Sequence, residues 1–316
     1  MAFPFRFGLH FWQLPLGDWR ARVRRYEALG YSTITFTDHV VVPQWEPIAA
    51  LAAVAAVTER LHVGSLVLDN SLRNPVLTAK AAATIDRLSG GRLELGLGAG
   101  YLAANFAAAG VAFARPGERL DQLEESIALM RRLWQDEKTT FHGRYYQVTD
   151  APRVAPEPVA PRLLVGGGGP KAMRLAGRVA DVVSMLPRLD TGEWSVRASL
   201  ADSTLERMVE KAAWVRAGAA AAGRDPAAVE LNTMVYGLAV GDDPTARREA
   251  LARDNGVAVA DLGDSTLFLT GTGPEVRARL LEYRDRVGLT YFSLFDPGDE
   301  QIAYLAEQVV GPLSRA

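Results

Sequence analysis

Short apolar runs of strand length alternate along this chain with longer stretches in which apolar residues recur at helical spacing. The runs expected to form strands cover residues 5–11, 32–38, 61–68, 92–97, 162–165, 181–186, 229–240 and 291–295. The stretches expected to form helices cover residues 18–29, 47–59, 75–88, 117–134, 170–180, 204–222, 244–253 and 274–286, and a further helix follows the last strand. Strand and helix therefore alternate from one end of the sequence to the other.

Eight strand–helix units within 316 residues predict a (β/α)8 TIM barrel. A doubly wound open sheet uses the same alternation, but the count of eight favours the barrel. Longer segments at 137–161, 188–203 and 255–273 predict insertions after strands four, six and seven. No segment has the character of a linker, so we expect one TIM-barrel domain over residues 1–316.

Composition excludes several classes of function. The net charge is −2 without a long basic block, which argues against nucleic-acid binding. There are no cysteines, so disulfides and thiolate chemistry are absent. The start of the chain lacks the pattern of a signal peptide, and the apolar run at 48–57 is too short to cross a bilayer. We expect a cytoplasmic protein without a membrane segment.

The chemistry of such a barrel is expected at the carboxyl ends of its strands. The polar and aromatic residues that fall there are His10, Trp12, Asp38, His39, Asn70, Tyr101 and Tyr236. His39 could donate a hydrogen bond or transfer a proton, because the pKa of histidine lies near neutrality. In the alternative interpretation, Asp38 caps local backbone and His39 is a satisfied supporting group.

Four consecutive glycines, Gly166, Gly167, Gly168 and Gly169, follow strand five and precede a helix expected to begin near Pro170. A helix N-terminus presents free N–H groups that favour a phosphate, and Lys171 adds a nearby cation. A tight connection filled with glycine is the alternative. A second glycine-rich strand end, Gly96–Gly100, lacks the spacing of a dinucleotide-binding fingerprint. Two glycine-rich ends at one barrel mouth suit a phosphate-bearing cofactor better.

Other catalytic classes find less support. The four histidines show no HxH or HExxH spacing, and no GxSxG motif is present. A metal hydrolase built on His10, Asp38 and His39 would need further ligands from strands five, six and eight. Only Asp296 follows one of these strands. We therefore predict no metal site.

The assembled motifs resemble the luciferase-like superfamily of flavin and deazaflavin oxidoreductases along nearly the whole chain. They are TFTDHV, GSLVLDNSLRNPVLTAKAAATIDRLSGGRLELGLGAGY, LLVGGGGPKAMRLAGRVAD and LTGTGPEVRARLLEY, in this order. The chain is most similar to the branch that uses coenzyme F420. The resemblance implies phosphate binding at Gly98, Ala99 and Gly100 and at Gly167–Gly169, and the ring of the cofactor beside Asp38 and His39. It also implies a non-proline cis peptide near Leu66–Val67, pressed against the ring.

The function that the resemblance implies is hydride transfer between F420 and a small organic substrate. Trp12 and Trp45 would wall the ring and substrate, and Asn70 and Tyr236 would contact the substrate. Sugar-phosphate dehydrogenases of this branch carry an acidic proton donor where this chain has Tyr101, which puts a glucose-6-phosphate-type reaction in doubt. His39 is then the first candidate donor, ahead of Tyr101 and His10.

Two alternatives share this fold. The first is a two-component monooxygenase that uses FMN, and the second is a protein that binds a cofactor without catalysis. The resemblance also implies a homodimer.

Overall fold

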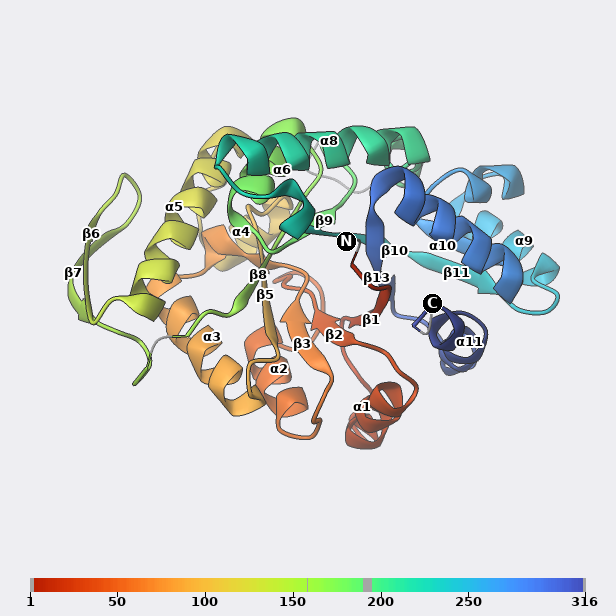
Figure 1. Cartoon of the computed structure of the whole chain (residues 1–316), viewed down its shortest axis with the longest axis horizontal. Helices are drawn as coiled ribbons and strands as arrows, with labels where there is room; N and C mark the ends of the chain where they lie inside the picture. The colour runs from red at the N-terminus through yellow and green to blue at the C-terminus, as the bar shows by residue number, and fades with distance from the viewer. Residues whose placement is uncertain (1–2, 158, 190–194, 315–316) are drawn as a thin grey trace.

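Eight parallel strands, each hydrogen-bonded to two neighbours, form a closed barrel (Figure 1). The computed structural model describes residues 3–157, 159–189 and 195–314. The barrel strands are β1 (Arg6–Phe11), β2 (Thr33–Phe36), β3 (His62–Ser65), β5 (Leu93–Gly98), β8 (Arg162–Gly167), β9 (Val182–Met185), β10 (Glu230–Val235) and β13 (Leu289–Phe295). Their order is β3–β2–β1–β13–β10–β9–β8–β5, and pairing of β3 with β5 completes the ring. The predicted (β/α)8 barrel is confirmed.

Helices surround the barrel and begin where the sequence supplies suitable first turns. They are α1 (Trp19–Ala28), α2 (Pro47–Ala55), α3 (Pro75–Ser89), α5 (Pro116–Gln135), α6 (Pro170–Val179), α8 (Leu205–Ala221), α10 (Gly273–Val287) and, after β13, α11 (Asp299–Leu305) and α12 (Gly311–Leu313). Proline occupies the first turn of α2, α3, α5, α6 and α10, where its missing N–H costs no helical bond. The Asn74 side chain caps α3 by accepting from the N–H groups of Val76 and Leu77.

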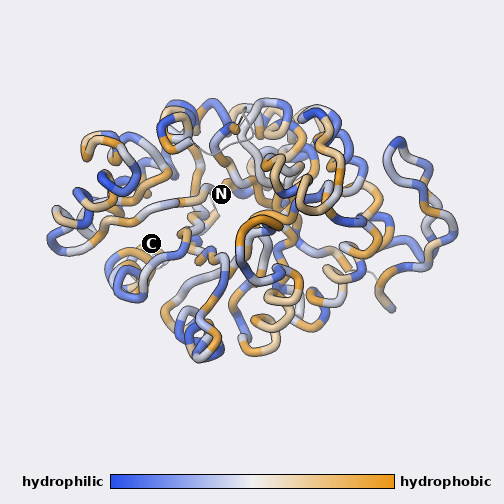
Figure 2. Tube along the Cα trace, turned by 180° about the vertical axis from the view of Figure 1, so that it is seen from behind, coloured by the Kyte–Doolittle hydropathy of each residue, from blue (hydrophilic) through white to orange (hydrophobic). Residues whose placement is uncertain are grey.

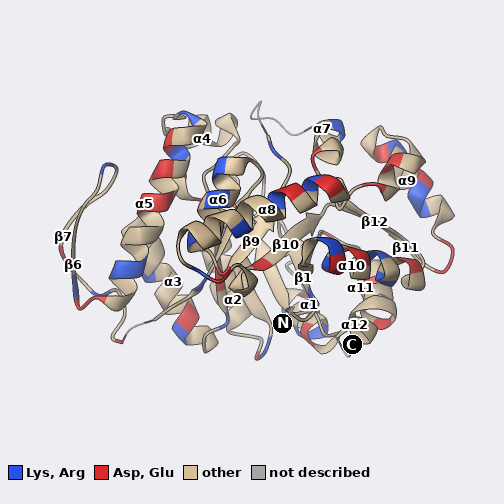
Figure 3. Cartoon of the chain, turned by 45° about the horizontal axis from the view of Figure 1, so that its top comes forward, with Lys and Arg blue, Asp and Glu red and all other residues tan. Residues whose placement is uncertain are grey.

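The core lies inside the barrel and between the barrel and its helices. Strand residues are buried on both faces, as parallel strands covered by helices require. Figure 2 shows hydrophobic positions gathered along the strands and hydrophilic positions along the outer turns. Charged residues of both signs are interspersed on outer helices such as α5 and α10 (Figure 3). Within the described residues, no helix is long and apolar enough to span a membrane.

Each expected insertion has secondary structure of its own. The first carries the antiparallel hairpin β6 (Lys138–His142) and β7 (Gln147–Pro152), which projects beyond α5 in Figure 1. The second contains α7 (Val196–Ala201), and its residues 190–194 lie outside the described part of the chain. The third contains the short helix η3 (Val259–Gly263) and the strand β12 (Phe268–Gly271). Between β5 and α5 the chain also forms the short helix α4 (Ala103–Ala109).

The expected seventh strand is wrong in its extent. It divides into β10, which belongs to the barrel, and β11 (Gly237–Val240), which pairs with β12 outside it. The division falls at Tyr236, because the N–H groups of Tyr236 and Gly237 both donate to the carbonyl of Leu267. These two hydrogen bonds direct the chain out of the barrel toward β12. Helix α9 (Thr245–Asn255) then follows β11.

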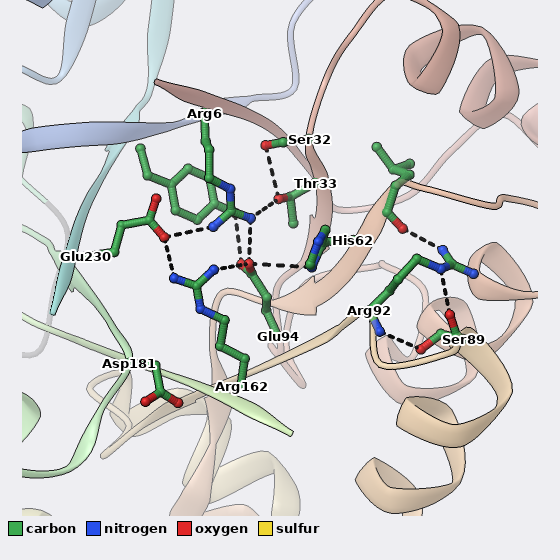
Figure 4. Close-up of polar contacts among 12 residues, drawn as sticks. Arg6, Ser32, Thr33, His62, Ser89, Arg92, Glu94, Arg162, Asp181 and Glu230 are labelled. Atoms are coloured by element: carbon green, nitrogen blue, oxygen red, sulfur yellow. Dashed lines mark hydrogen bonds and ion pairs between the residues drawn. The ribbon is translucent and has the colours of Figure 1, made fainter. Parts of the chain in front are cut away.

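An ion-pair network closes the amino-terminal end of the barrel (Figure 4). Arg6 and Arg162 each contact both Glu94 and Glu230, whose carboxylates are almost completely buried. The Tyr291 hydroxyl lies 3.3 Å from Glu94 Oε2. Burial alone would lower the pKa of Arg6, but Glu94, Tyr291 and Glu230 together raise it. Two negative and two positive groups therefore balance at the end of the barrel opposite to the candidate site.

Candidate active site at the carboxyl ends of the strands

The histidine at the end of β1 is buried below the barrel mouth, by which we mean the carboxyl ends of the eight strands. The His10 side chain is 1% exposed, and its Nδ1 lies 2.8 Å from Thr35 Oγ1. Burial, and then the charge of His39, lowers the pKa of His10 to about 3. The imidazole is therefore neutral at pH 7, and its role as a proton donor stays a prediction.

Asp38 and His39 follow the end of β2 at Phe36, so strand alternation does not direct them to opposite faces. Both Asp38 oxygens accept from Arg73, at 2.7 Å each, in a two-pronged ion pair. Asp38 Oδ2 also accepts from the backbone N–H of Asp69 at 3.0 Å. These contacts match the local-structure interpretation of Asp38, and its contact with a cofactor stays a prediction.

His39 is held by a residue that the sequence analysis did not select. Its Nδ1 lies 2.9 Å from Nδ2 of Asn105, and its ring meets the ring of Tyr101 edge-on with centroids 5.9 Å apart. Burial lowers the pKa of His39, partly opposed by Asp38. Burial also raises the pKa of the Tyr101 phenol. The signal for Asn105 was a lone amide in the otherwise apolar helix sequence AANFAAA.

Aromatic rings gather at the neighbouring ends of β1, β13 and β10. Phe295, at the end of β13, lies 5.3 Å from Trp12, 5.4 Å from His10 and 5.8 Å from Tyr236 between ring centroids. Trp12 is 41% exposed, so its ring is available to a ligand. Trp45 instead packs against Trp19 and stacks on Phe36. Sequence reasoning placed Trp12 and Tyr236 here but overlooked Phe295.

The peptide bond between Leu66 and Val67 is cis, as the family resemblance implies. The Val67 side chain faces glycines of two neighbouring strands: an added Cβ would lie 2.6 Å from it at Gly98 and 3.0 Å at Gly166. A larger residue at either position would collide with Val67. These glycines therefore have a packing role, in addition to the phosphate role predicted for them.

A buried carboxyl group underlies the loop after β5. Gly100 has φ +75, and an added Cβ would overlap the carboxylate of Asp69. Asp69 is 5% exposed, and burial raises its pKa to about 6. Buried carboxyl groups with a shifted pKa recur at functional sites. The position of Asp69 at the end of the strand-three segment was the available signal.

The hairpin insertion reaches the mouth through Tyr146. The Asn70 amide nitrogen lies 3.4 Å from the Tyr146 hydroxyl. The hairpin tip is anchored by Glu125 of α5, which accepts from the N–H groups of Arg144, Tyr145 and Tyr146. Asn70 is thus held by the insertion, and its contact with substrate stays a prediction.

The four glycines have unequal positions. Gly166 and Gly167 belong to β8, so the turn contains only Gly168 and Gly169. An added Cβ at Gly168 would lie 2.7 Å from backbone atoms of Leu186, Pro187 and Arg188. At Gly169, among the residues that the structure describes, it would meet only the Arg188 side chain, at 3.8 Å. The first turn of α6, at Pro170, is therefore approachable from the side of Gly169.

Two cationic residues, Lys171 and Arg188, lie near these glycines. Lys171 points to α5, where its Nζ lies 2.6 Å from Asp121 Oδ1, and its role as a cation beside a phosphate stays a prediction. Arg188, on the loop after β9, lies next to Gly169. Its backbone N–H donates to Asp202 at 2.7 Å, and the completely buried Lys211 bonds the same carboxylate and the Leu186 carbonyl. Burial lowers the pKa of Lys211, and Asp202 partly opposes this.

A cavity of about 290 Å³ lies between the insertions after strands six and seven. Its walls include Arg197, Thr204, Asp261 and Ser265. It borders the apolar cluster of Leu200, Leu262 and Phe268, against which Tyr236 packs. Across the described part of the chain, no group of three or more His, Asp or Glu residues could hold a metal ion.

The chain forms a closed (β/α)8 barrel, and the carboxyl ends of its strands bring histidine, tyrosine and tryptophan side chains close to two glycine-rich turns. This arrangement is typical of (β/α)8-barrel enzymes. The model of the luciferase-like monooxygenase family matches residues 4–258, and the chain belongs to this family.

Curated relatives share the name F420-dependent glucose-6-phosphate dehydrogenase. The protein from Intrasporangium calvum is 34% identical over an aligned length of 211 residues, and the alignment covers 59% of this chain and 62% of that protein. The one from Amycolatopsis mediterranei is 34% identical over 165 residues, 50% of this chain and 49% of that protein. The matched segments thus span less than two thirds of these two relatives. A protein from Beutenbergia cavernae is 30% identical over an aligned length of 312 residues, and the alignment covers 90% of this chain and 89% of that protein.

Solved structures share the fold at lower identity. An F420-dependent secondary alcohol dehydrogenase in complex with an F420–acetone adduct has a TM-score of 0.80 at 20% identity, covering 99% of this chain and 100% of that chain. The long-chain alkane monooxygenase LadA has a TM-score of 0.81 at 14% identity, covering 100% and 92%. At these identities the likeness concerns the fold alone.

Proposed function

We propose that this chain is an oxidoreductase that binds coenzyme F420 and uses it for hydride transfer with a small organic substrate. The observation that carries the proposal is the match over 90% of the chain to a relative named as F420-dependent. The aromatic and histidine side chains at the barrel mouth agree with it.

The residues at the mouth fit a phosphate-bearing ring cofactor. The first turn of α6 offers N–H groups without intrahelical partners, and a ligand can approach them past Gly169. Arg188 supplies positive charge beside the same turn. On the inner side, Val67 and Trp12 present apolar surface, and His39 presents an imidazole. The phosphate would lie at α6 and the ring between Val67 and His39.

When bound, F420 supplies two-electron hydride chemistry. The chain then has three tasks: to hold the phosphate at Gly169, to exclude water with Trp12 and Phe295, and to offer a hydrogen-bonding group from His39. Tyr101, whose pKa is raised by burial, keeps its proton at neutral pH and can donate a hydrogen bond.

Glucose 6-phosphate is the first substrate to test, because the relatives are named for it. Tyr101 stands where the resemblance expects an acidic donor, so we propose a small organic substrate without assigning this sugar phosphate. The cavity between the insertions after strands six and seven, which borders the cluster that holds Tyr236, is the part of the chain best placed to select it.

The setting of the enzyme belongs to the same proposal. We infer one domain over residues 1–316, a homodimer, a cytoplasmic location and no nucleic-acid or membrane partner. The support is the net charge of −2 and the resemblance to the family.

An anaerobic turnover assay tests the proposed activity. Oxidised F420 is mixed with glucose 6-phosphate or 2-propanol, and reduced F420 with acetone, while the visible absorbance of the deazaflavin is followed. We expect a change that requires the protein with at least one probe, and its loss in Gly169→Val. If F420 absorbance never changes, while reduced FMN supports substrate-dependent oxygen consumption, the chain is a monooxygenase instead.

A further inference from the structure

A buried amide next to the mouth has only one possible orientation. Asn105 lies in the first turn of α4, and its side chain is 2% exposed. Its Oδ1 accepts from the backbone N–H groups of Val40 at 3.0 Å and Val41 at 3.2 Å. An amide NH2 group cannot accept a hydrogen bond from an N–H donor, so the side facing these two residues must be the oxygen.

The other side of this amide faces His39. Its Nδ2 lies 2.9 Å from His39 Nδ1. Because the NH2 group only donates, Nδ1 must accept, and a neutral imidazole that accepts at Nδ1 carries its proton on Nε2. The tautomer therefore follows from the two backbone donors of Val40 and Val41, which fix the amide.

The groups around His39 leave this assignment intact. Asp38 is engaged by Arg73 and by the backbone of Asp69. His10, on β1, is buried and neutral at pH 7, and Tyr101 contributes its ring edge. Among the residues that the structure describes, none forms a hydrogen bond with Nε2. A protonated imidazole would also set a donor against the donating amide of Asn105, in agreement with the lowered pKa of His39.

We propose that Asn105 is a positioning residue that locks His39 in the Nε2–H tautomer, so that His39 acts in the mouth as a hydrogen-bond donor. The ligand group opposite Nε2 is then an acceptor oxygen, of a carbonyl or an oxyanion. A hydroxyl group that must give its proton to a base would find no free lone pair on Nε2. This assignment of the ligand class rests on the proposed function, whereas the tautomer does not.

The test is nitrogen NMR of the histidine rings in the free protein and in Asn105→Asp. An aspartate keeps one oxygen that accepts from the N–H groups of Val40 and Val41. Its second oxygen replaces the donating NH2 group opposite His39 with an acceptor, so Nδ1 of His39 would carry a proton. An acidic residue is favourable in the first turn of a helix, so the variant is expected to fold. The His39 signals are assigned by their loss in His39→Gln.

We expect the wild-type protein to show a protonated Nε2 and an unprotonated Nδ1 at neutral pH. In Asn105→Asp we expect a proton on Nδ1 and a His39 pKa raised by about 1–3 units. A wild-type His39 that is protonated on Nδ1, or an unchanged titration in the variant, would overturn the proposal. The spectrum is readable whether or not F420 binds, so failure of the proposed function is a separate result.

Discussion

At the scale of single residues, Gly168 and Gly169, which precede α6, have different surroundings. An added Cβ at Gly168 would lie 2.7 Å from backbone atoms of the loop after β9, which cannot move away independently. Gly169 has extended backbone angles, and among the described residues an added Cβ there would meet the Arg188 side chain at an ordinary contact distance of 3.8 Å. The same tetraglycine sequence therefore contains one position that has no room for a side chain and one that has room, and the second is the position proposed to face a ligand.

We expect Gly168→Ala to lower the free energy of unfolding by about 1–3 kcal/mol, because the loop must shift to admit the methyl group. Gly169→Val should change that energy by no more than about 0.5 kcal/mol, yet obstruct the approach to α6. Denaturant unfolding measures the first effect, and a cofactor titration measures the second. Gly169→Ala is the control for loss of glycine flexibility. If Gly169→Val binds the cofactor as tightly as the wild type, the phosphate does not bind at this turn.

At the scale of elements, the hairpin of the first insertion depends on one carboxylate. Glu125 on α5 accepts three backbone N–H groups from the turn at Arg144–Tyr146, and Tyr146 in turn reaches Asn70. Of the two hairpin strands only Thr139 is fully buried, while Phe141, Val148 and Ala151 pack partly buried against the core. The turn itself is held to α5 by the hydrogen bonds of Glu125.

We predict that Glu125→Ala opens the hairpin turn locally, because its three donors lose a charged acceptor, at a cost of about 1–3 kcal/mol. Hydrogen exchange of the amides at 143–146 should accelerate, while the barrel strands keep their protection. Glu124→Ala is the matched control, since Glu124 pairs with Arg178 instead. Equal exchange in the two variants would contradict this account of the turn.

Features that depend on neighbouring residues could be predicted from the sequence, whereas those that depend on contacts between distant elements could not. Proline at helix starts and short apolar runs located the barrel units, because both signals are local in sequence. The break at Tyr236 depends on the distant carbonyl of Leu267, and the pairing of Lys171 with Asp121 depends on how α5 and α6 pack. Asn105 was missed for the same reason, since its partners Val40 and Val41 lie more than sixty residues away in sequence.

At the scale of the whole molecule, burial of histidine makes stability depend on pH. The pKa of His10 is lowered to about 3 by burial and by His39, whereas an unfolded histidine has a pKa near 6.5. Between these values the unfolded chain binds a proton that the folded chain does not, so stability falls as pH falls from about 6.5 toward 3.

His10→Gln should flatten this dependence by up to about 1.4 kcal/mol per pH unit, which corresponds to one proton. The two slopes are measured by urea unfolding of the variant and the wild type at several pH values between about 4 and 7. This range includes the pKa of about 6.5 at which an unfolded histidine titrates. Thr35→Val removes the hydrogen bond to His10 but keeps the histidine, so its slope should follow the wild type. Parallel curves for His10→Gln and the wild type would show that another group controls the acid limb.

A calorimetric titration of the protein with F420 and, separately, with FMN tests the proposed cofactor directly. We expect F420 to bind at least about tenfold more tightly than FMN, a difference of about 1.4 kcal/mol in binding free energy. Preference for FMN would contradict the deazaflavin assignment and favour a monooxygenase of the same family. Binding of neither cofactor would leave a luciferase-like barrel without the proposed chemistry.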